Sequence, residues 1–153
     1  MNYDIRIEQF LGQVLAVVRR RATKQQLGKV IPEACGTVWN GLRSQQIKGA
    51  GRNVAVYHDM LFNLEVGVEM NNDAFHQSGE IVASSLPRGE VAATTHFGPY
   101  HLLGEAHDAV QQWCAAHRRE TVWPCWEIYG HWLDEWQSDP GKIRTDVYYL
   151  LKP

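Results

Sequence analysis

The sequence lacks a strong excess of charge of either sign. Its 153 residues include 15 Lys and Arg against 17 Asp and Glu, so the formal net charge is −2. Surfaces that bind nucleic-acid phosphates are rich in Lys and Arg, and this composition therefore predicts no direct DNA binding. The basic run at residues 19–21 is short and typical of a solvated helix entry.

Long apolar runs are also missing. The longest one, residues 14–18, is far too short to cross a bilayer, and the first ten residues carry charges where a signal peptide would have an apolar core. We therefore expect a cytoplasmic protein without membrane contact. Because 153 residues suffice for one well-buried domain and not for two, residues 1–153 are predicted to form a single domain.

Motifs for covalent catalysis and for metal binding are absent as well. No serine lies in a GxSxG elbow, and the glycine-rich residues 49–52 do not follow a strand into a helix as a phosphate loop would. Three cysteines form no CxxC pair and fit small buried thiols better than disulfides: Cys35, Cys114 and Cys125. Three histidines lack a second pair of ligands and are predicted to be surface or capping residues: His96, His101 and His107. We expect no metal and no cofactor.

What the chain does contain is a strand-helix-strand-strand pattern that occurs twice. In the first half, apolar residues recur at spacings of three and four after Lys24, which predicts an amphipathic helix: Leu27, Val30, Ile31, Ala34, Val38 and Leu42. Pro32 and Gly36 are expected to make its first turns irregular. Strands are predicted before and after it, at residues 3–8, 13–19, 53–58 and 62–70, with residues 13–19 either a second strand or a continuation of the first.

The second half repeats this order. Two strands are predicted around Pro87, then a helix, then two more strands: residues 80–84, 89–96, 101–117, 125–131 and 145–151. We therefore predict an α+β fold of duplicated strand-helix-strand-strand modules, with pseudo-repeats at about residues 1–72 and 78–153. The antiparallel sheet should carry both main helices on one face, with a central ligand cleft between the modules.

The clearest chemical signal lies in residues 126–132, where a lone carboxylate is set among aromatic side chains of a predicted strand. Alternation places Glu127 and Tyr129 on one face of that strand and Trp126 on the other. An ionised carboxylate is costly to bury, so this position predicts a bound cation, a hydrogen-bonded partner or a held proton. The alternative is an ordinary cross-strand ion pair, for which Arg144 is a candidate.

Aromatic residues are predicted to complete a pocket around this carboxylate, since a cation over a ring face gains roughly 0.5 to 2 kcal/mol. The inner wall is assigned to Glu127, Tyr129, Tyr57 and Tyr148, and the rim to Trp39, Phe97, Tyr100 and Trp132. Ordinary core packing is the alternative for each ring. Glu65 is the second carboxylate of interest, because two carboxylates in one cavity would hold one proton between them and favour catalysis.

Six short motifs, in this order and spacing, resemble the successive signatures of the GyrI-like family: residues 51–59, 65–68, 86–92, 97–100, 126–129 and 145–148. That family is the stand-alone form of the bacterial effector-binding domain found fused to MerR-type and AraC-type transcription regulators. The resemblance implies a duplicated module with a central pocket. It also implies multidrug binding of hydrophobic, often cationic, aromatic compounds through an acidic residue that matches Glu127. Some members hydrolyse cyclopropane-bearing toxins, and the founding member protects DNA gyrase.

Together these observations predict a protein that binds amphipathic, cationic aromatic drugs or toxins through Glu127 and a tyrosine-rich wall. The first alternative is a hydrolase in which Glu127 activates water or protonates a strained ring, and in which Tyr57 or Tyr129 orients the substrate. The second alternative is an inhibitor protein that acts on gyrase. With no DNA-binding module expected ahead of it, the domain would act by sequestration, by chemistry or through gyrase or a separate regulator. An exposed edge strand could support a homodimer.

Overall fold

The computed structural model describes residues 2–71 and 77–153. Their strands and two main helices follow the predicted order, strand-helix-strand-strand, twice, and the short helix α3 (Glu135–Ser138) falls where a loop was predicted. The first half contains β1 (Arg6–Arg21), α1 (Leu27–Ser44), β2 (Ala50–Tyr57) and β3 (Asn63–Met70). The second contains β4 (Val82–Phe97), α2 (Leu103–Ala116), β5 (Thr121–Tyr129), α3 (Glu135–Ser138) and β6 (Arg144–Leu151). The pseudo-repeats and the single domain stay predictions.

All strand pairs are antiparallel, as predicted, but the sheet closes on itself. The strand order is β1-β3-β2-β5-β6-β4, with β4 paired back to β1. Closure depends on two pairings between the halves, β1 with β4 and β2 with β5. Neither pairing leaves a local signal in the sequence, because each half taken alone would form an open sheet. The predicted antiparallel sheet with two main helices is thus confirmed as a six-stranded closed barrel.

Alternation along the strands gives the sheet two faces. The face that we call the helix face carries the apolar sides of α1 and α2, and its strand residues include Ala55, Val66 and Tyr149. The face that we call the opposite face holds a separate apolar cluster with Val17, Val56 and Trp126. Both main helices therefore pack on the same side of the strands.

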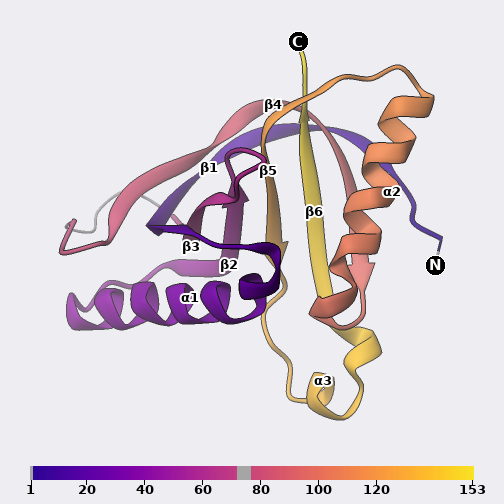
Figure 1. The fold of residues 1–153 in the computed structure, drawn as a ribbon. Helices are drawn as coiled ribbons and strands as arrows, with labels where there is room; N and C mark the ends of the chain where they lie inside the picture. Colours follow the sequence, from indigo (N-terminus) through magenta and orange to yellow (C-terminus); the bar gives the residue numbers. More distant parts are fainter. Residues whose placement is uncertain (1, 72–76) are drawn as a thin grey trace.

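The helices leave the middle of the helix face between them. α1 packs on β1 and β3, whereas α2 packs on β4 and β6. The strand order places β2 and β5 next to each other between those two pairs. Figure 1 shows α1 and α2 apart from each other, with β6 running between them in this view. Side chains from β2 and β5 therefore face the space flanked by the two helices.

Two local predictions differ from the structure, those for β4 and α1. β1 is one continuous strand, which was one of the two possibilities left open by the sequence, and β4 runs unbroken through Pro87, where two strands were expected. Proline is tolerated there because β4 pairs with β6 only over residues 91–97, so the edge beside Pro87 needs no donor. α1 also continues through Pro32, and the irregular turn lies before it, at Lys24–Gln26.

Candidate functional site

Glu127 lies in β5 at the centre of the helix face. Strand alternation turns Glu127 to this face together with Cys125, which belongs to the apolar cluster under the helices. Trp126 and Ile128 point to the opposite face. Only 3% of Glu127 is exposed to solvent. A carboxylate this deeply buried needs partners for both of its oxygens.

Three side chains from three different elements supply those partners. The Tyr57 hydroxyl donates to Oε1 at 3.0 Å, and the Tyr129 hydroxyl donates to the same oxygen. On the other side, His107 Nε2 lies 2.6 Å from Oε2. Residues from β2, β5 and α2 thus meet at one carboxylate.

The network continues beyond the histidine. His107 Nδ1 lies 2.7 Å from the hydroxyl of Tyr149 in β6. The imidazole also packs edge-on against the rings of Tyr57 and Tyr149, with centroids 6.1 Å and 5.6 Å away. We call Tyr57, His107, Glu127, Tyr129 and Tyr149 the carboxylate network.

The environment keeps Glu127 ionised. Burial alone would raise the pKa of Glu127, but the hydrogen bond and charge of His107, followed by the hydroxyls of Tyr129 and Tyr57, lower that pKa below the usual value. A carboxyl group in this state is a base or a counter-ion. It is poorly suited to donate a proton, which argues against the predicted role of Glu127 as an acid.

The tyrosines of the network stay protonated. Burial, then the charge of Glu127, raise the pKa values of Tyr57 and Tyr129 well above the usual range. Burial is also the largest cause that raises the pKa of Tyr149 and brings the pKa of the Cys125 thiol to about 12. All four groups are therefore neutral hydrogen-bond donors at physiological pH.

The structure separates Tyr148 from the predicted inner wall. Tyr57, Glu127 and Tyr129 come together as expected, but Tyr148 lies on the opposite face and stacks on Trp126, with ring centroids 5.6 Å apart. Its neighbour Tyr149 takes the place beside the network. Adjacent strand residues point to opposite faces, so only one of the two can reach Glu127. A ligand contact by Tyr148 stays untested.

The four predicted rim residues occupy different surroundings. The exposed ring of Tyr100 packs edge-on against Tyr129 at 5.7 Å, which places it beside the network. The Trp39 indole donates to Asn53 Oδ1 at 2.6 Å. Phe97 and Trp132 are both about half exposed, at 52% and 51%. Of these four residues, Tyr100 is the one whose ring contacts a residue of the network.

Glu65 does not share a cavity with Glu127. It lies in β3 between Leu64 and Val66, which both point to the helix face, so its own side chain points to the opposite face. The Arg144 alternative is also wrong, because Arg144 pairs with Asp146 at 3.3 Å. Glu127 therefore stands apart from the other buried acids.

The predicted surface or capping positions of His96 and His107 differ most from the structure. His96, predicted to be a surface or capping residue, is fully buried between the Tyr3 hydroxyl and the Pro99 carbonyl. His107 is not a surface residue either, because it binds Glu127. The signal for His107 was present, since it follows the buried Leu103 by four positions and precedes the buried Val110 by three, on the apolar face of α2. Within residues 2–71 and 77–153, no three His, Cys, Asp or Glu side chains form a group that could hold a metal ion.

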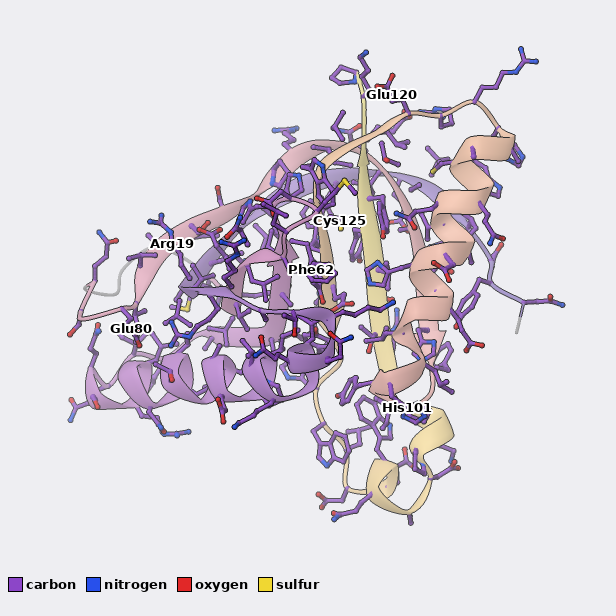
Figure 2. The ribbon with its side chains drawn as sticks, viewed as in Figure 1. Arg19, Phe62, Glu80, His101, Glu120 and Cys125 are labelled. Carbon is purple, nitrogen blue, oxygen red and sulfur yellow. The ribbon has the colours of Figure 1, made fainter. Side chains whose placement is uncertain are left out.

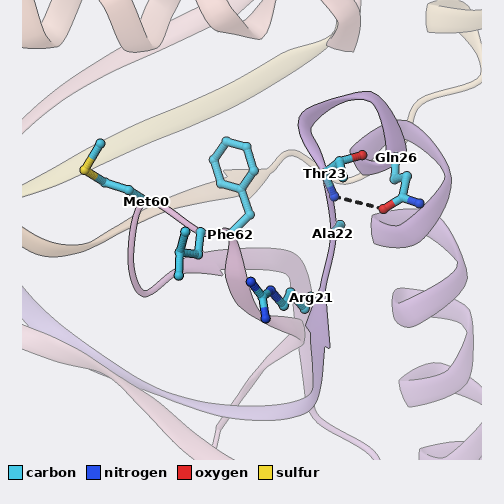
Figure 3. A pocket seen from close by; sticks show the side chains of 7 residues that line it. Arg21, Ala22, Thr23, Gln26, Met60 and Phe62 are labelled. Atoms are coloured by element: carbon cyan, nitrogen blue, oxygen red, sulfur yellow. Dashed lines mark hydrogen bonds between the residues drawn. The ribbon is translucent and has the colours of Figure 1, made fainter.

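The surface has two hollows that do not include the residues of the network. One, of about 280 Å³, lies between the β1–α1 connection and the β2–β3 hairpin and is lined by Arg21, Ala22, Thr23, Gln26, Met60, Leu61 and Phe62 (Figure 3). The other, of about 520 Å³, is lined by residues of β1, β3 and β4 such as Leu11, Met70 and Leu86. Phe62 also packs edge-on against Tyr57, with centroids 5.8 Å apart. Figure 2 shows Phe62 and Cys125 in the space between the two main helices. Phe62 therefore both lines the first hollow and contacts Tyr57 of the carboxylate network.

One buried hydroxyl beside the network has no hydrogen-bond partner among the described residues. Thr145 in β6 lies opposite Tyr129 in β5, so both side chains point to the helix face. Thr145 is fully buried.

Comparison with known proteins gives matches of fold. Neither a protein-family model nor a curated protein matches the sequence. The C-terminal domain of EcmrR superposes with a TM-score of 0.79 at 19% identity, over 99% of both chains. SAV2435, solved bound to tetraphenylphosphonium, has a TM-score of 0.67 at 14% identity, over 99% of this chain and 94% of that one. A hydrolase from Listeria innocua has a TM-score of 0.63 at 10% identity, over 97% and 91%. The predicted resemblance to the GyrI-like family is thus confirmed as a similarity of fold.

In the described part of the chain, the structure has no helix long and apolar enough to cross a membrane.

Proposed function

We propose that this protein binds hydrophobic aromatic cations on the helix face, with Glu127 as the counter-charge. One observation carries the proposal. Glu127 is ionised and 3% exposed, and its partners in the described chain are two phenols and an imidazole, with no Lys or Arg among them. A buried negative charge without a permanent positive partner is an attractive position for a cationic ligand.

The surroundings fit an aromatic ligand. The rings of Tyr57, Tyr129 and Tyr100 lie around or next to the carboxylate, and a cation over a ring gains roughly 0.5 to 2 kcal/mol. The hollow beside Phe62 would take an apolar part of the ligand. Met60 and Leu61 in that hollow are 82% and 63% exposed, and unbranched methionine adapts to ligands of different shape. The tetraphenylphosphonium bound to SAV2435, a protein of the same fold, supports the same chemistry.

Calorimetric titration with tetraphenylphosphonium near neutral pH tests the proposal. Glu127→Gln should weaken binding roughly 10-fold to 150-fold, as expected for about 1.5 to 3 kcal/mol of interaction with a charged group. Glu65→Gln removes the same charge from the opposite face and should change the affinity by less than about twofold. Equal binding by wild type and Glu127→Gln would refute the proposal.

A second function, hydrolysis, is favoured by one observation. The ionised Glu127 carboxylate and the His107 imidazole form a base and a proton donor 2.6 Å apart. In this function Glu127 would activate water, and Tyr57 would orient the substrate. Mass spectrometry on a cyclopropane-bearing electrophile after incubation separates the two functions. A water-added product that disappears in Glu127→Gln would show hydrolysis. An unchanged ligand would show that the protein binds this compound without hydrolysing it, if it binds it at all.

The remaining predicted partners need a different assay. An inhibitor protein should act on gyrase supercoiling with no small molecule present, whereas a ligand-binding protein should not. A separate regulator and a homodimer also stay predictions, as does the central cleft.

A further inference from the structure

Two members of the carboxylate network are partly exposed to solvent, His107 on the Oε2 side of Glu127 and Tyr129 on the Oε1 side. The side chain of His107 is 18% exposed, against 4% for that of Glu127. The imidazole binds Oε2, while the two phenols share Oε1. A ligand that approaches Glu127 from solvent on the Oε2 side therefore meets His107 first.

The network satisfies the imidazole in both of its protonation states. In the neutral state, Nε2–H donates to Glu127 and Nδ1 accepts the hydroxyl proton of Tyr149. In the charged state, both nitrogens donate, and the Tyr149 hydroxyl can turn its proton toward Cys125, which lies opposite Tyr149 in the pairing of β5 with β6. A proton can thus enter or leave His107 while the heavy atoms keep their positions.

The two states differ in the charge of the site. With neutral His107 the carboxylate network carries the single negative charge of Glu127. With charged His107 the network is neutral overall. Only the first state offers an uncompensated charge to a cationic ligand.

The net charge of the network is set by Glu127 and His107, because the other network groups that face His107 are neutral. β5 contributes Glu127 and the neutral Cys125, β2 contributes the neutral Tyr57, and β6 contributes the neutral Tyr149. On β4, the titratable groups of this face are His96, which is held by Tyr3 and the Pro99 carbonyl, and the exposed Glu90, which pairs with Arg119. The neighbour on α2 itself is Asp108, whose charge acts on Tyr149.

We propose that His107 is the internal competitor for cationic ligands at Glu127, so that binding a cation expels the proton of His107. The inference rests on the proposed function and specifies its regulation. Cation affinity should rise with pH by up to about tenfold per pH unit over the range in which histidines titrate, because one proton leaves for each cation bound. A neutral ligand of similar shape needs no counter-charge and should bind independently of pH.

Calorimetry on the wild-type protein measures the expelled proton directly. Tetraphenylphosphonium is titrated between about pH 5.5 and about pH 8.5, in pairs of buffers with different ionisation enthalpies. The difference in heat between paired buffers gives the number of protons released, which should rise toward about one as the pH falls. Triphenylphosphine oxide, a neutral analogue, should release none. Cation binding without proton release across this range would overturn the inference.

Two variants identify the group. His107→Gln keeps a neutral donor but cannot be charged, so its cation affinity should lose the dependence on pH and exceed that of wild type at about pH 5.5. His117→Gln removes the other histidine of the α2 region, which stacks on Trp113 away from the network, and should keep the wild-type dependence. A pH dependence that survives in His107→Gln would assign the proton to another group and refute the inference.

The outcomes for the two proposals are distinguishable. If Glu127→Gln binds tetraphenylphosphonium as well as wild type, or if the cation does not bind at any pH, the proposed function fails and the inference fails with it. If Glu127 is needed but no proton is released, only the inference about His107 fails.

Discussion

Two buried glutamates, one on each face of the sheet, have different kinds of partner. Glu65 on the opposite face accepts from the Ser84 hydroxyl at 2.6 Å, contacts His58 at 3.1 Å and lies 3.5 Å from the guanidinium of Arg19. Glu127 on the helix face has phenols and an imidazole. Arginine carries its charge at every physiological pH, so the charge of Glu65 is permanently compensated. The charge of Glu127 is compensated only while His107 is protonated, which makes burial without arginine the mark of the candidate site.

Asp146 extends this difference. It is also buried, at 4% exposure, and its partners are the Thr95 hydroxyl and the guanidinium groups of Arg144 and Arg52. The acids that hold the barrel together are thus paired with arginines, whereas Glu127 is not. The following experiments test this division between a structural face and a binding face.

The largest effect should come from Trp126→Ala. Trp126 is fully buried on the opposite face, against Phe10 and Tyr148, and its truncation should cost about 3 to 5 kcal/mol of unfolding free energy. Urea unfolding measures this loss. Any molecules that remain folded should bind tetraphenylphosphonium with nearly wild-type affinity. A large loss of affinity in the folded fraction would show that the two faces are not independent.

A smaller effect is expected from Tyr57→Phe. This change removes one hydrogen bond to the buried charge of Glu127 and should lower the unfolding free energy by about 1.5 to 3 kcal/mol. The cation affinity should fall too, because the carboxylate is held less firmly. Urea unfolding and calorimetric titration provide the two values. A stability equal to wild type would contradict the role of Tyr57 as a partner of Glu127.

The acid side of the stability curve should depend on Glu127. Its pKa is lower in the folded protein than in the unfolded chain, so its stabilising contribution is complete above the usual glutamate pKa and is lost as the pH falls through the folded value. Melting temperatures measured between about pH 7 and about pH 3 should therefore fall less in Glu127→Gln than in wild type. Parallel curves would contradict the pairing of Glu127 with His107.

The smallest effect is expected from Tyr148→Phe. The ring keeps its stacking on Trp126, and the lost hydroxyl lies on the face away from Glu127, so cation affinity should change by less than about twofold. Titration calorimetry at one pH suffices. A clear loss of affinity would restore Tyr148 to the ligand-binding wall and weaken the division between the faces.

Local periodicity predicted the elements and half of the site. Alternation within one strand was enough to place Glu127 and Tyr129 together, and the helical spacing of apolar residues predicted both main helices. Alternation cannot tell which face of another strand turns toward that site. For this reason the predicted wall contains Tyr148, whereas in the structure Tyr149 is the partner of His107.

The missing parts depend on contacts between distant residues. His107 lies on the buried face of α2, but its role as a partner of Glu127 depends on the packing of α2 on the helix face of the sheet, which places the two side chains 2.6 Å apart. Closure of the sheet likewise depends on β1 meeting β4. Neither event changes the local pattern of apolar and polar residues, so the sequence alone left them open.

The pairing of β1 with β4 also has a kinetic consequence. Arg6 lies opposite Ala93 and Val17 opposite Val82, so most of the paired positions of the first strand face a segment that is synthesised much later. Non-local pairing of this kind is associated with folding in milliseconds to seconds rather than microseconds. Until β4 emerges from the ribosome, β1 exposes an unpaired edge that other chains can join. The closed barrel is therefore protected from aggregation only after its second half is made.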